Sequence, residues 1–182
     1  PLCLEALRLR RLPALSRPAF DEALRQFNMH GCGVDQWYSQ VIRTLPSEGL
    51  DQLFKLLCLI EEQDQWPSDA TLTRIVFLRR PDGRDRAIGI LPFLARLWHK
   101  CRSDITAGWD ESVDRPWDTA RKGTRGCLPA AYRRQLRAEA AMAAGKHCIT
   151  LLWDVAAFFD SLSLDLVVRE AEAQHYPGQH LF

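Results

Sequence analysis

The chain has 182 residues, of which 47% are hydrophobic and 26% are charged, and its formal net charge is +1. These proportions are typical of a globular protein with one domain, or with one domain and part of another. A net charge near zero excludes no class of partner, because a local patch of charge decides binding. No apolar run approaches the roughly 20 residues of a membrane-spanning helix, so we expect no contact with a membrane.

Six cysteines are spread along the chain without a C-x-x-C pair or histidines at zinc-ligand spacing. We interpret them as reduced thiols, and a disulfide framework stays open as the alternative. The first residues lack both a signal-type apolar segment and an initiator Met. We therefore expect an intracellular protein, nuclear or cytoplasmic and not secreted, and a chain that is a fragment of a longer one.

The first strong pattern is a helix over residues 47–65, which Ser47 should cap and which should end before Pro67. Its apolar residues recur at helical spacing and predict one buried face. They are Leu50, Leu53, Phe54, Leu57 and Ile60.

Residues 71–91, "TLTRIVFLRRPDGRDRAIGIL", predict a β-hairpin. Apolar and β-branched residues lie on both sides of Pro-Asp-Gly, which fixes φ, caps with a side chain and then permits a positive φ. Strand alternation should place Arg84 and Arg86 on one face. The hairpin is therefore expected to carry several arginines.

The remaining elements follow in order. Residues 92–105 predict a helix, 106–127 a polar loop, and 129–144 a helix with Pro129 at its first position and Gly145 just past its end. The apolar run 147–154 predicts a strand buried on both faces, and a last helix should be capped by Ser163 and end near residue 174. This mixture of helices and a few strands indicates an α/β or α+β fold, and we favour α+β.

Asp154 stands at the end of the predicted buried strand, where the backbone turns and solvent enters. A carboxylate there suits Mg²⁺, which takes a few carboxylate oxygens together with water and phosphate. The alternative is that Asp154 caps the following turn, and Asp160 has a similar alternative as a helix cap or dipole partner. Position alone leaves both interpretations open.

The spacing in "DVAAFFDS", residues 154–161, resembles the first catalytic palm motif of reverse transcriptases, in the form found in group II intron and non-LTR retrotransposon enzymes. Upstream, residues 31–46 resemble the segment that opens the fingers region. Residues 61–100 are similar to the next block of that family, with Trp-Pro after a helix, a basic residue before Pro-Asp-Gly, and an Arg before an apolar pair. The resemblance extends over about residues 31–174.

The resemblance implies a role for five residues. Asp154 would be catalytic and would bind both Mg²⁺ ions, with the carbonyl of Val155 as a further ligand. Phe159 would lie under the incoming sugar and exclude a 2′-hydroxyl. Arg80 and Arg86 would bind the triphosphate of a dNTP, although the family more often has Lys at the position of Arg80. The implied partners are an RNA template, a DNA primer and a dNTP.

Other basic residues are candidates for contacts with a template or primer backbone. They are Lys100, Arg102, Arg121, Lys122, Arg125, Arg133 and Arg134. Tryptophans at 98, 109 and 117 lie among them, and each could stack on a base or, as is more usual for Trp, pack in the core. A charged hairpin can also simply keep a sheet edge soluble.

The expected organisation is an N-terminal extension over residues 1–30, a fingers region over 31–145, and the start of a palm over 146–182. The chain contains no Asp-Asp pair, which the family supplies from a later hairpin, so we expect this piece to be inactive by itself. Two alternatives stay open. One is a degenerate or domesticated, non-catalytic nucleic-acid-binding module, and the other is an unrelated Mg²⁺-dependent phosphotransferase or hydrolase.

Overall fold

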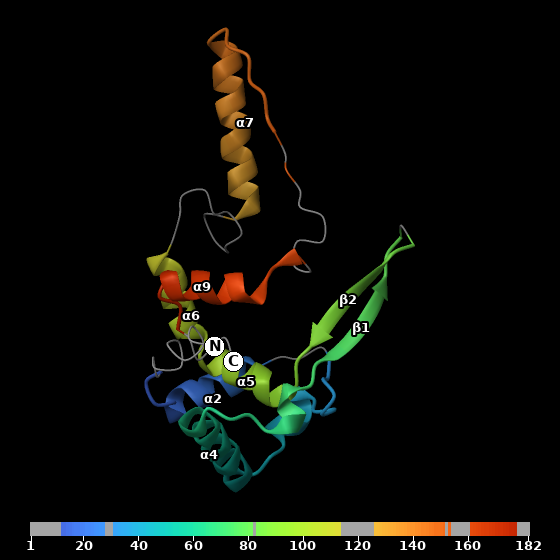
Figure 1. Cartoon of the computed structure of the whole chain (residues 1–182), viewed down its shortest axis with the longest axis vertical. Coiled ribbons are helices and arrows are strands. Elements are labelled where there is room, and N and C mark those ends of the chain that lie inside the picture. Colours follow the sequence, from blue (N-terminus) through green and yellow to red (C-terminus); the bar gives the residue numbers. More distant parts are fainter. Residues whose placement is uncertain are drawn as a thin grey trace.

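The computed structural model describes residues 12–27, 31–81, 83–113, 126–151, 153 and 161–177. Helices and two strands make up these ranges, which confirms an α+β composition (Figure 1). In chain order they are α2 (Arg17–Gln26), α3 (Ser39–Arg43), α4 (Ser47–Gln63), the 3₁₀ helix η1 (Ser68–Thr71), β1 (Arg74–Arg79), β2 (Asp85–Ile90), α5 (Phe93–Cys101), α6 (Ser103–Ser112), α7 (Cys127–Ala143) and α9 (Leu164–Ala173). None of the described helices is long and apolar enough to cross a membrane.

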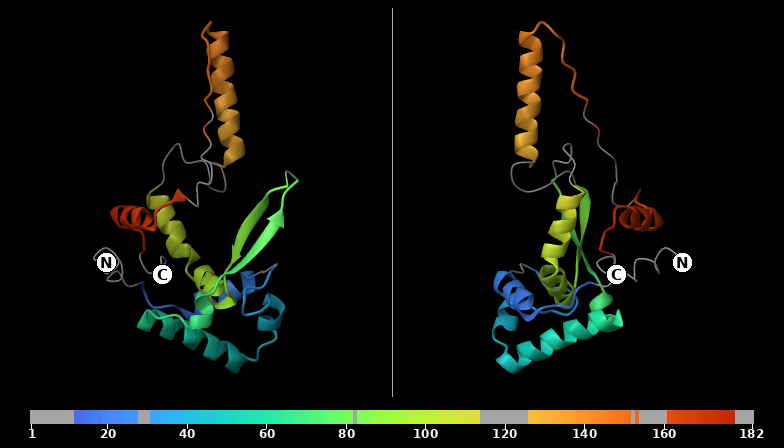
Figure 2. Two further views of the ribbon diagram at one scale, coloured as in Figure 1. Left: turned by 45° about the vertical axis from the view of Figure 1, so that its right-hand side comes forward. Right: turned by 90° about the vertical axis from the view of Figure 1, so that its left-hand side faces the viewer.

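The main hydrophobic core lies between α2, α4 and α5, which pack together at one end of the molecule (Figure 2). Phe20 of α2, Leu57 of α4 and Leu97 of α5 are fully buried there. Helix α2 lies within the segment expected to be an N-terminal extension, so that segment shares its core with the elements that follow.

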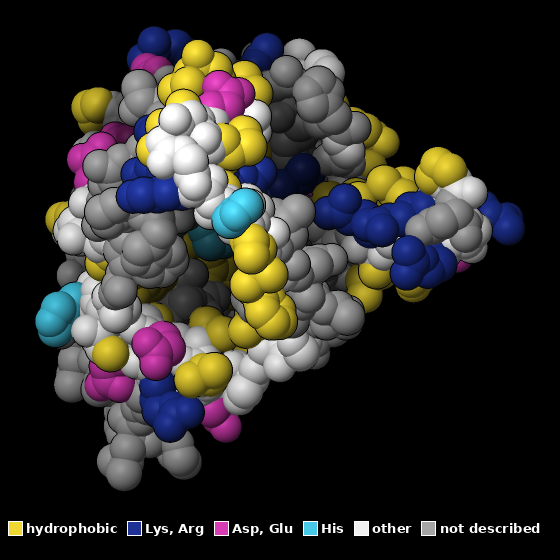
Figure 3. All heavy atoms as spheres, turned by 90° about the horizontal axis from the view of Figure 1, so that it is seen from above, with side chains coloured by type: hydrophobic (Ala, Val, Ile, Leu, Met, Phe, Trp, Pro, Cys, Tyr) yellow, Lys and Arg dark blue, Asp and Glu magenta, His cyan; other side chains and the backbone are white. Residues whose placement is uncertain are grey.

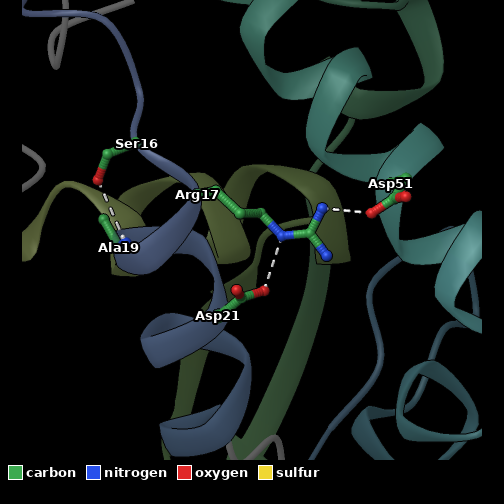
Figure 4. Close-up of polar contacts among 5 residues, drawn as sticks. All are labelled: Ser16, Arg17, Ala19, Asp21 and Asp51. Atoms are coloured by element: carbon green, nitrogen blue, oxygen red, sulfur yellow. Dashed lines mark hydrogen bonds and ion pairs between the residues drawn. The ribbon is translucent and has the colours of Figure 1, made fainter.

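The N-terminus of α2 explains why residues 17–26 form a helix that was not predicted. Ser16 is the N-cap, and its hydroxyl accepts a hydrogen bond from the Ala19 amide at 3.3 Å. The guanidinium of Arg17 donates to Asp21 in the same helix at 2.9 Å and also to Asp51 of α4 (Figure 4). Arg17 therefore joins the two helices at a partly exposed site, where solvent screening keeps the contribution of such pairs small.

Helix α4 confirms the predicted buried face, since Leu57 and Ile60 are buried and Leu50, Leu53 and Phe54 pack against the core. The predicted cap is wrong: Pro46 is the N-cap, and Ser47 is already the first helical residue. The last helical residue is Gln63, and the C-cap residue Asp64 has a left-handed φ of 52°. This residue terminates α4 before the Trp-Pro pair.

The predicted helix over 92–105 is two helices, α5 and α6, which meet at Arg102. The backbone of Arg102 (φ −102°, ψ 6°) leaves the helical region, and the chain resumes at once as α6 up to Ser112. The polar loop predicted from residue 106 is therefore wrong for residues 106–112. A tertiary contact accounts for the difference, because the indole of Trp109 donates to the Gln174 carbonyl at 2.8 Å and packs edge-on against Tyr176.

Helix α7 is confirmed but begins two residues earlier than predicted, with Gly126 as N-cap and Pro129 as its third residue. Proline is tolerated there because the first amides of a helix have no partner within it. The end is as predicted: Gly145 has φ +70°, and the amides of Gly145 and Lys146 reach back to carbonyls of the last turn at 2.9 Å. The helix projects away from the core (Figure 1).

The predicted buried strand over 147–154 is wrong for the residues that the structure describes. Residues 147–151 and 153 have no strand pairing, and Ile149 and Trp153 are 84% and 88% exposed. A strand needs a neighbour for its backbone groups, and within the described ranges β1 and β2 pair only with each other. Helix α9 is confirmed, with Ser163 at its N-cap position, although its hydroxyl makes no capping hydrogen bond.

Candidate nucleic-acid interface

The predicted hairpin is present as an antiparallel pair of β1 and β2 that extends outward from the helical core (Figures 1 and 2). Val76 lies opposite Ile88, Leu78 opposite Arg86, and Arg79 opposite Asp85. Residues directly opposite one another share a face of the hairpin. This register decides where each arginine lies.

The turn between the strands confirms the role expected of its glycine. The Arg80 amide donates to the Arg84 carbonyl at 2.9 Å, and the Gly83 amide donates to the Arg80 carbonyl at 3.0 Å. Gly83 has φ +80°, a conformation that disfavours other residues. The pattern is that of a three-residue hairpin loop closed by a left-handed glycine. Asp82 lies outside the described residues.

Three arginines gather at the outer end of one face. Arg86 lies opposite Leu78, and the period of two along each strand places Arg80 and Arg84 on the same side. All three are exposed. Seen from above, Lys and Arg side chains cover much of the projecting arm (Figure 3). We call Arg80, Arg84 and Arg86 the arginine face.

Arg80 and Arg86, the two arginines singled out for phosphate, lie on this face together. Among the described residues, neither has a carboxylate within ion-pair distance. A planar, permanently charged guanidinium can bind two phosphate oxygens at once. Two exposed guanidinium groups on one face therefore suit a polyanion.

The opposite face of the hairpin is apolar along most of its length. Ile75 and Phe77 are 61% and 67% exposed, and the residues opposite them are the small Gly89 and Ala87. The two faces thus differ in chemistry, and only the arginine face offers a cluster of cations.

The base of the hairpin is fixed by the segment 31–38, which directly precedes α3. The Asp35 carboxylate accepts the Phe93 amide at 2.5 Å and so caps α5, which begins three residues after β2. A Cβ on Gly33 would lie 2.8 Å from the Leu91 carbonyl oxygen, which leaves no room for a side chain. These contacts fix the chain segment by which β2 enters α5.

Arg96 of α5 makes a further contact with the same segment, donating from Nη2 to the Gly31 carbonyl at 2.8 Å. Burial lowers the pKa of the Arg96 guanidinium, and the nearby Asp35 carboxylate counteracts that effect. Arg96 is thus a structural cation that holds segment 31–38 against α5.

Helix α7 carries a second group of exposed cations. Arg133 and Arg134 were predicted, and Arg137 lies three and four residues further on, which places all three on one side of the helix. Like charges at this spacing repel one another weakly in the absence of an anion. The i+3 and i+4 spacing was the signal by which Arg137 could have been found. We call these residues the α7 arginine stripe.

The predicted nucleic-acid contact of Arg102 is wrong, because its side chain belongs to the core, and Trp98 packs in the core, the more usual of its two expected roles. Arg102 is 4% exposed and Trp98 is 3% exposed. Both bind Glu61 of α4: Trp98 Nε1 and Arg102 Nε donate to the same carboxylate oxygen at 2.7 Å and 2.6 Å, and Arg102 Nη2 donates to the other oxygen. Trp98 also packs edge-on against Trp66 at 5.6 Å. This buried network joins α4 to α5.

The other residues predicted to contact nucleic acid are either packed against the protein or lie outside the described residues. Trp109 is packed against Tyr176, and Lys100 is half-buried on α5. Trp117, Arg121, Lys122 and Arg125 lie outside the described residues.

The predicted catalytic and metal-binding residues Asp154 and Val155, the predicted sugar contact Phe159, and Asp160 all lie outside the described residues. Within the described part of the chain, no group of three His, Cys, Asp or Glu side chains could hold a metal ion. The expectation that Asp154 and Val155 bind Mg²⁺ therefore rests on the sequence alone.

Comparison of the chain with family models, with curated proteins and with solved structures gives no significant match.

Proposed function

We propose that this chain is the fingers region and the start of the palm of a reverse transcriptase, which in its complete form extends a DNA primer on an RNA template. The observation that carries the proposal is the arginine face of the hairpin. Arg80 and Arg86 lie together on an exposed face, and they are the two residues to which the sequence resemblance assigns triphosphate binding. The order of the sequence blocks adds support.

Nucleotidyl transfer depends on holding a triphosphate and stabilising the charge that develops on it. In this proposal Arg80 and Arg86 hold the phosphate oxygens of the dNTP, and Phe159 packs against its sugar. Asp154 and the Val155 carbonyl would hold Mg²⁺, which supplies charge stabilisation at the transferring phosphoryl group when bound. The chain has no Asp-Asp pair, so we expect no polymerisation from these 182 residues alone.

The second candidate is a nucleic-acid-binding module without catalysis. The α7 arginine stripe favours it, because three exposed arginines on one helix face suit a phosphate backbone and need neither Asp154 nor a metal ion. An unrelated Mg²⁺-dependent phosphotransferase has less support, since such an enzyme has no clear need for arginines on a separate hairpin.

The experiment is the salt dependence of RNA binding by the 182-residue chain, measured by fluorescence anisotropy with a labelled single-stranded RNA, which serves as a phosphate-bearing probe of the arginine face. If both arginines contact phosphate, the Arg80→Gln/Arg86→Gln double variant should reduce the slope of log K against log salt by about 1.4, at roughly 0.7 per contact. The matched control is Arg25→Gln on α2, an arginine whose side chain is 74% exposed and paired with Glu22.

The control should bind RNA as the wild-type chain does. An equal slope for the double variant and the control would contradict a phosphate-binding role of the arginine face. A normal slope for the double variant with a reduced slope for Arg133→Gln/Arg137→Gln would favour the second candidate.

A further inference from the structure

A groove runs along α4, on elements other than the arginine hairpin. One hollow of about 300 Å³ is formed by residues of α3, α4, η1 and the start of α5, with Trp37 and Leu53 in its walls. A second hollow of about 440 Å³ is lined by Leu59 and Trp66, among others. The two hollows share Leu56 and Pro67, so they are adjacent, and we call the two together the α4 groove.

The walls of the α4 groove are apolar and partly open to solvent. Trp37, Leu56 and Leu59 are 40%, 38% and 45% exposed. The Trp37 ring stacks on the ring of the buried Phe93, with 6.0 Å between the ring centroids and an interplanar angle of 23°. This wall of the groove therefore packs against the hydrophobic core. Large apolar side chains that line a hollow in this way are typical of a recognition surface.

The charge of the α4 groove has one sign. Asp35 and Asp69 line it, and no Lys or Arg is among the described residues that do so. One oxygen of Asp35 accepts the Phe93 amide, whereas its Oδ1 is buried without a hydrogen-bond partner among the described residues. Asp35 lies near the Arg96 guanidinium, so the exposed Asp69 is the carboxylate that favours a cationic occupant and disfavours a phosphate backbone.

We propose that the α4 groove binds an amphipathic helix of a partner protein, with large apolar side chains on one face of the helix and lysine or arginine beside them. Two hollows side by side fit successive apolar side chains of one segment, as in helix-in-groove recognition. Asp69, which is exposed on η1, would attract the basic residues, and Leu56 lies at the centre of the contact. This surface is separate from the proposed nucleotide and RNA contacts and extends beyond them.

The test uses the 182-residue chain and a fluorescein-labelled, leucine–lysine amphipathic peptide of about 14 residues, roughly four helical turns. The matched probe has glutamate in place of each lysine. Anisotropy should show binding of the lysine peptide at least about tenfold tighter than binding of the glutamate peptide. Leu56→Arg should weaken the lysine peptide about tenfold, and Asp69→Asn should weaken it several-fold and reduce its salt dependence.

The control is Leu128→Arg on α7, which places the same charge at a leucine that is 82% exposed and outside the groove. It should leave peptide binding unchanged, and circular dichroism should show that every variant is folded. Because Asp69 is exposed on η1, Asp69→Asn keeps the test valid if Leu56→Arg does not fold. Equal binding of both peptides, or equal binding by the wild type and Asp69→Asn, would overturn the proposal.

RNA binding gives a separate readout. Leu56→Arg should leave the contribution of Arg80 and Arg86 to the RNA salt slope unchanged. Tighter RNA binding by Asp69→Asn than by the wild type, with peptide binding unaffected, would instead overturn the proposal in favour of nucleic acid at this groove.

Discussion

The Glu61–Arg102 pair provides a strong test of the structure, because the two residues are far apart in sequence and Arg102 had been a candidate for nucleic-acid contact. Their side chains are only 10% and 5% exposed. Removing one partner of a buried ion pair leaves an uncompensated charge and typically costs about 3–5 kcal/mol. We therefore expect Arg102→Met to lower the free energy of unfolding by about 3 kcal/mol, a large part of the stability of a small domain.

The assay is urea denaturation followed by tryptophan fluorescence, for which Trp66 and Trp98 at the network are intrinsic probes. Arg25→Met, at an exposed arginine, should change stability by no more than about 0.5 kcal/mol. Glu61→Leu/Arg102→Met should be more stable than Arg102→Met alone, because it removes the isolated carboxylate.

The double variant Glu61→Leu/Arg102→Met should not regain the full stability of the wild type, since the Trp98 indole loses its hydrogen-bond acceptor at a cost of about 1–3 kcal/mol. A loss below about 1 kcal/mol in Arg102→Met, or a double variant less stable than the single, would refute the buried network. If Arg102→Met kept its stability but bound RNA more weakly, Arg102 would have to be an exposed residue that contacts RNA.

Three further predictions concern other parts of the chain. Gly33→Ala should lower the free energy of unfolding by about 1–3 kcal/mol through overpacking. Gly108→Ala in α6, where an added Cβ meets nothing within 4 Å, should raise the free energy of unfolding by up to about 1 kcal/mol. Urea denaturation of both variants checks this, and equal effects of the two substitutions would contradict it. Burial raises the pKa of Cys101 to about 12 from 9.0, so the folded state keeps a proton that the unfolded chain loses. This contribution to stability is complete below pH 9 and declines above pH 9 by up to about 1.4 kcal/mol per pH unit. Between pH 8.5 and 10 the Cys101→Ala variant should therefore lose less stability than the wild type. An equal loss in the two proteins would count against a buried thiol. If a longer protein has the proposed polymerase activity, Phe159→Val should raise its incorporation of ribonucleotides relative to deoxyribonucleotides. An unchanged ratio in active protein would exclude the proposed role of Phe159 as the sugar contact.

The elements that local sequence determines were predicted well. The helical spacing of Leu50, Leu57 and Ile60 gave the buried face of α4, and Gly83 and Gly145 marked turns that require a positive φ. In each case the information lies within a few neighbouring residues, so periodicity and turn chemistry suffice.

The predictions that were wrong concern residues whose conformation or burial depends on contacts with residues far away in the sequence. The polar residues before Ser112 are helical because Trp109 packs against the segment that follows α9. The apolar residues around Ile149 suggested a buried strand, but the described structure provides no neighbouring strand to pair with them. The core location of Arg102 depends on Glu61, which is 41 residues away. Composition and periodicity carry no information about such pairs.

The candidate site was predicted in part. The sequence identified Arg80 and Arg86, and the hairpin register places them on one exposed face. Arg137 was missed although its helical spacing from Arg133 and Arg134 was available. The role proposed for Asp154 remains a prediction, because that residue lies outside the described part of the chain.

The most direct test of the central claim is primer extension on a poly(rA) template with an oligo(dT) primer, using the longest protein that the reading frame encodes. Our account predicts Mg²⁺-dependent incorporation of dTTP that Asp154→Asn abolishes and that Arg80→Gln/Arg86→Gln weakens. Incorporation that is unaffected by Asp154→Asn would contradict the account. RNA binding without incorporation by the folded wild-type protein would instead support the non-catalytic binding module.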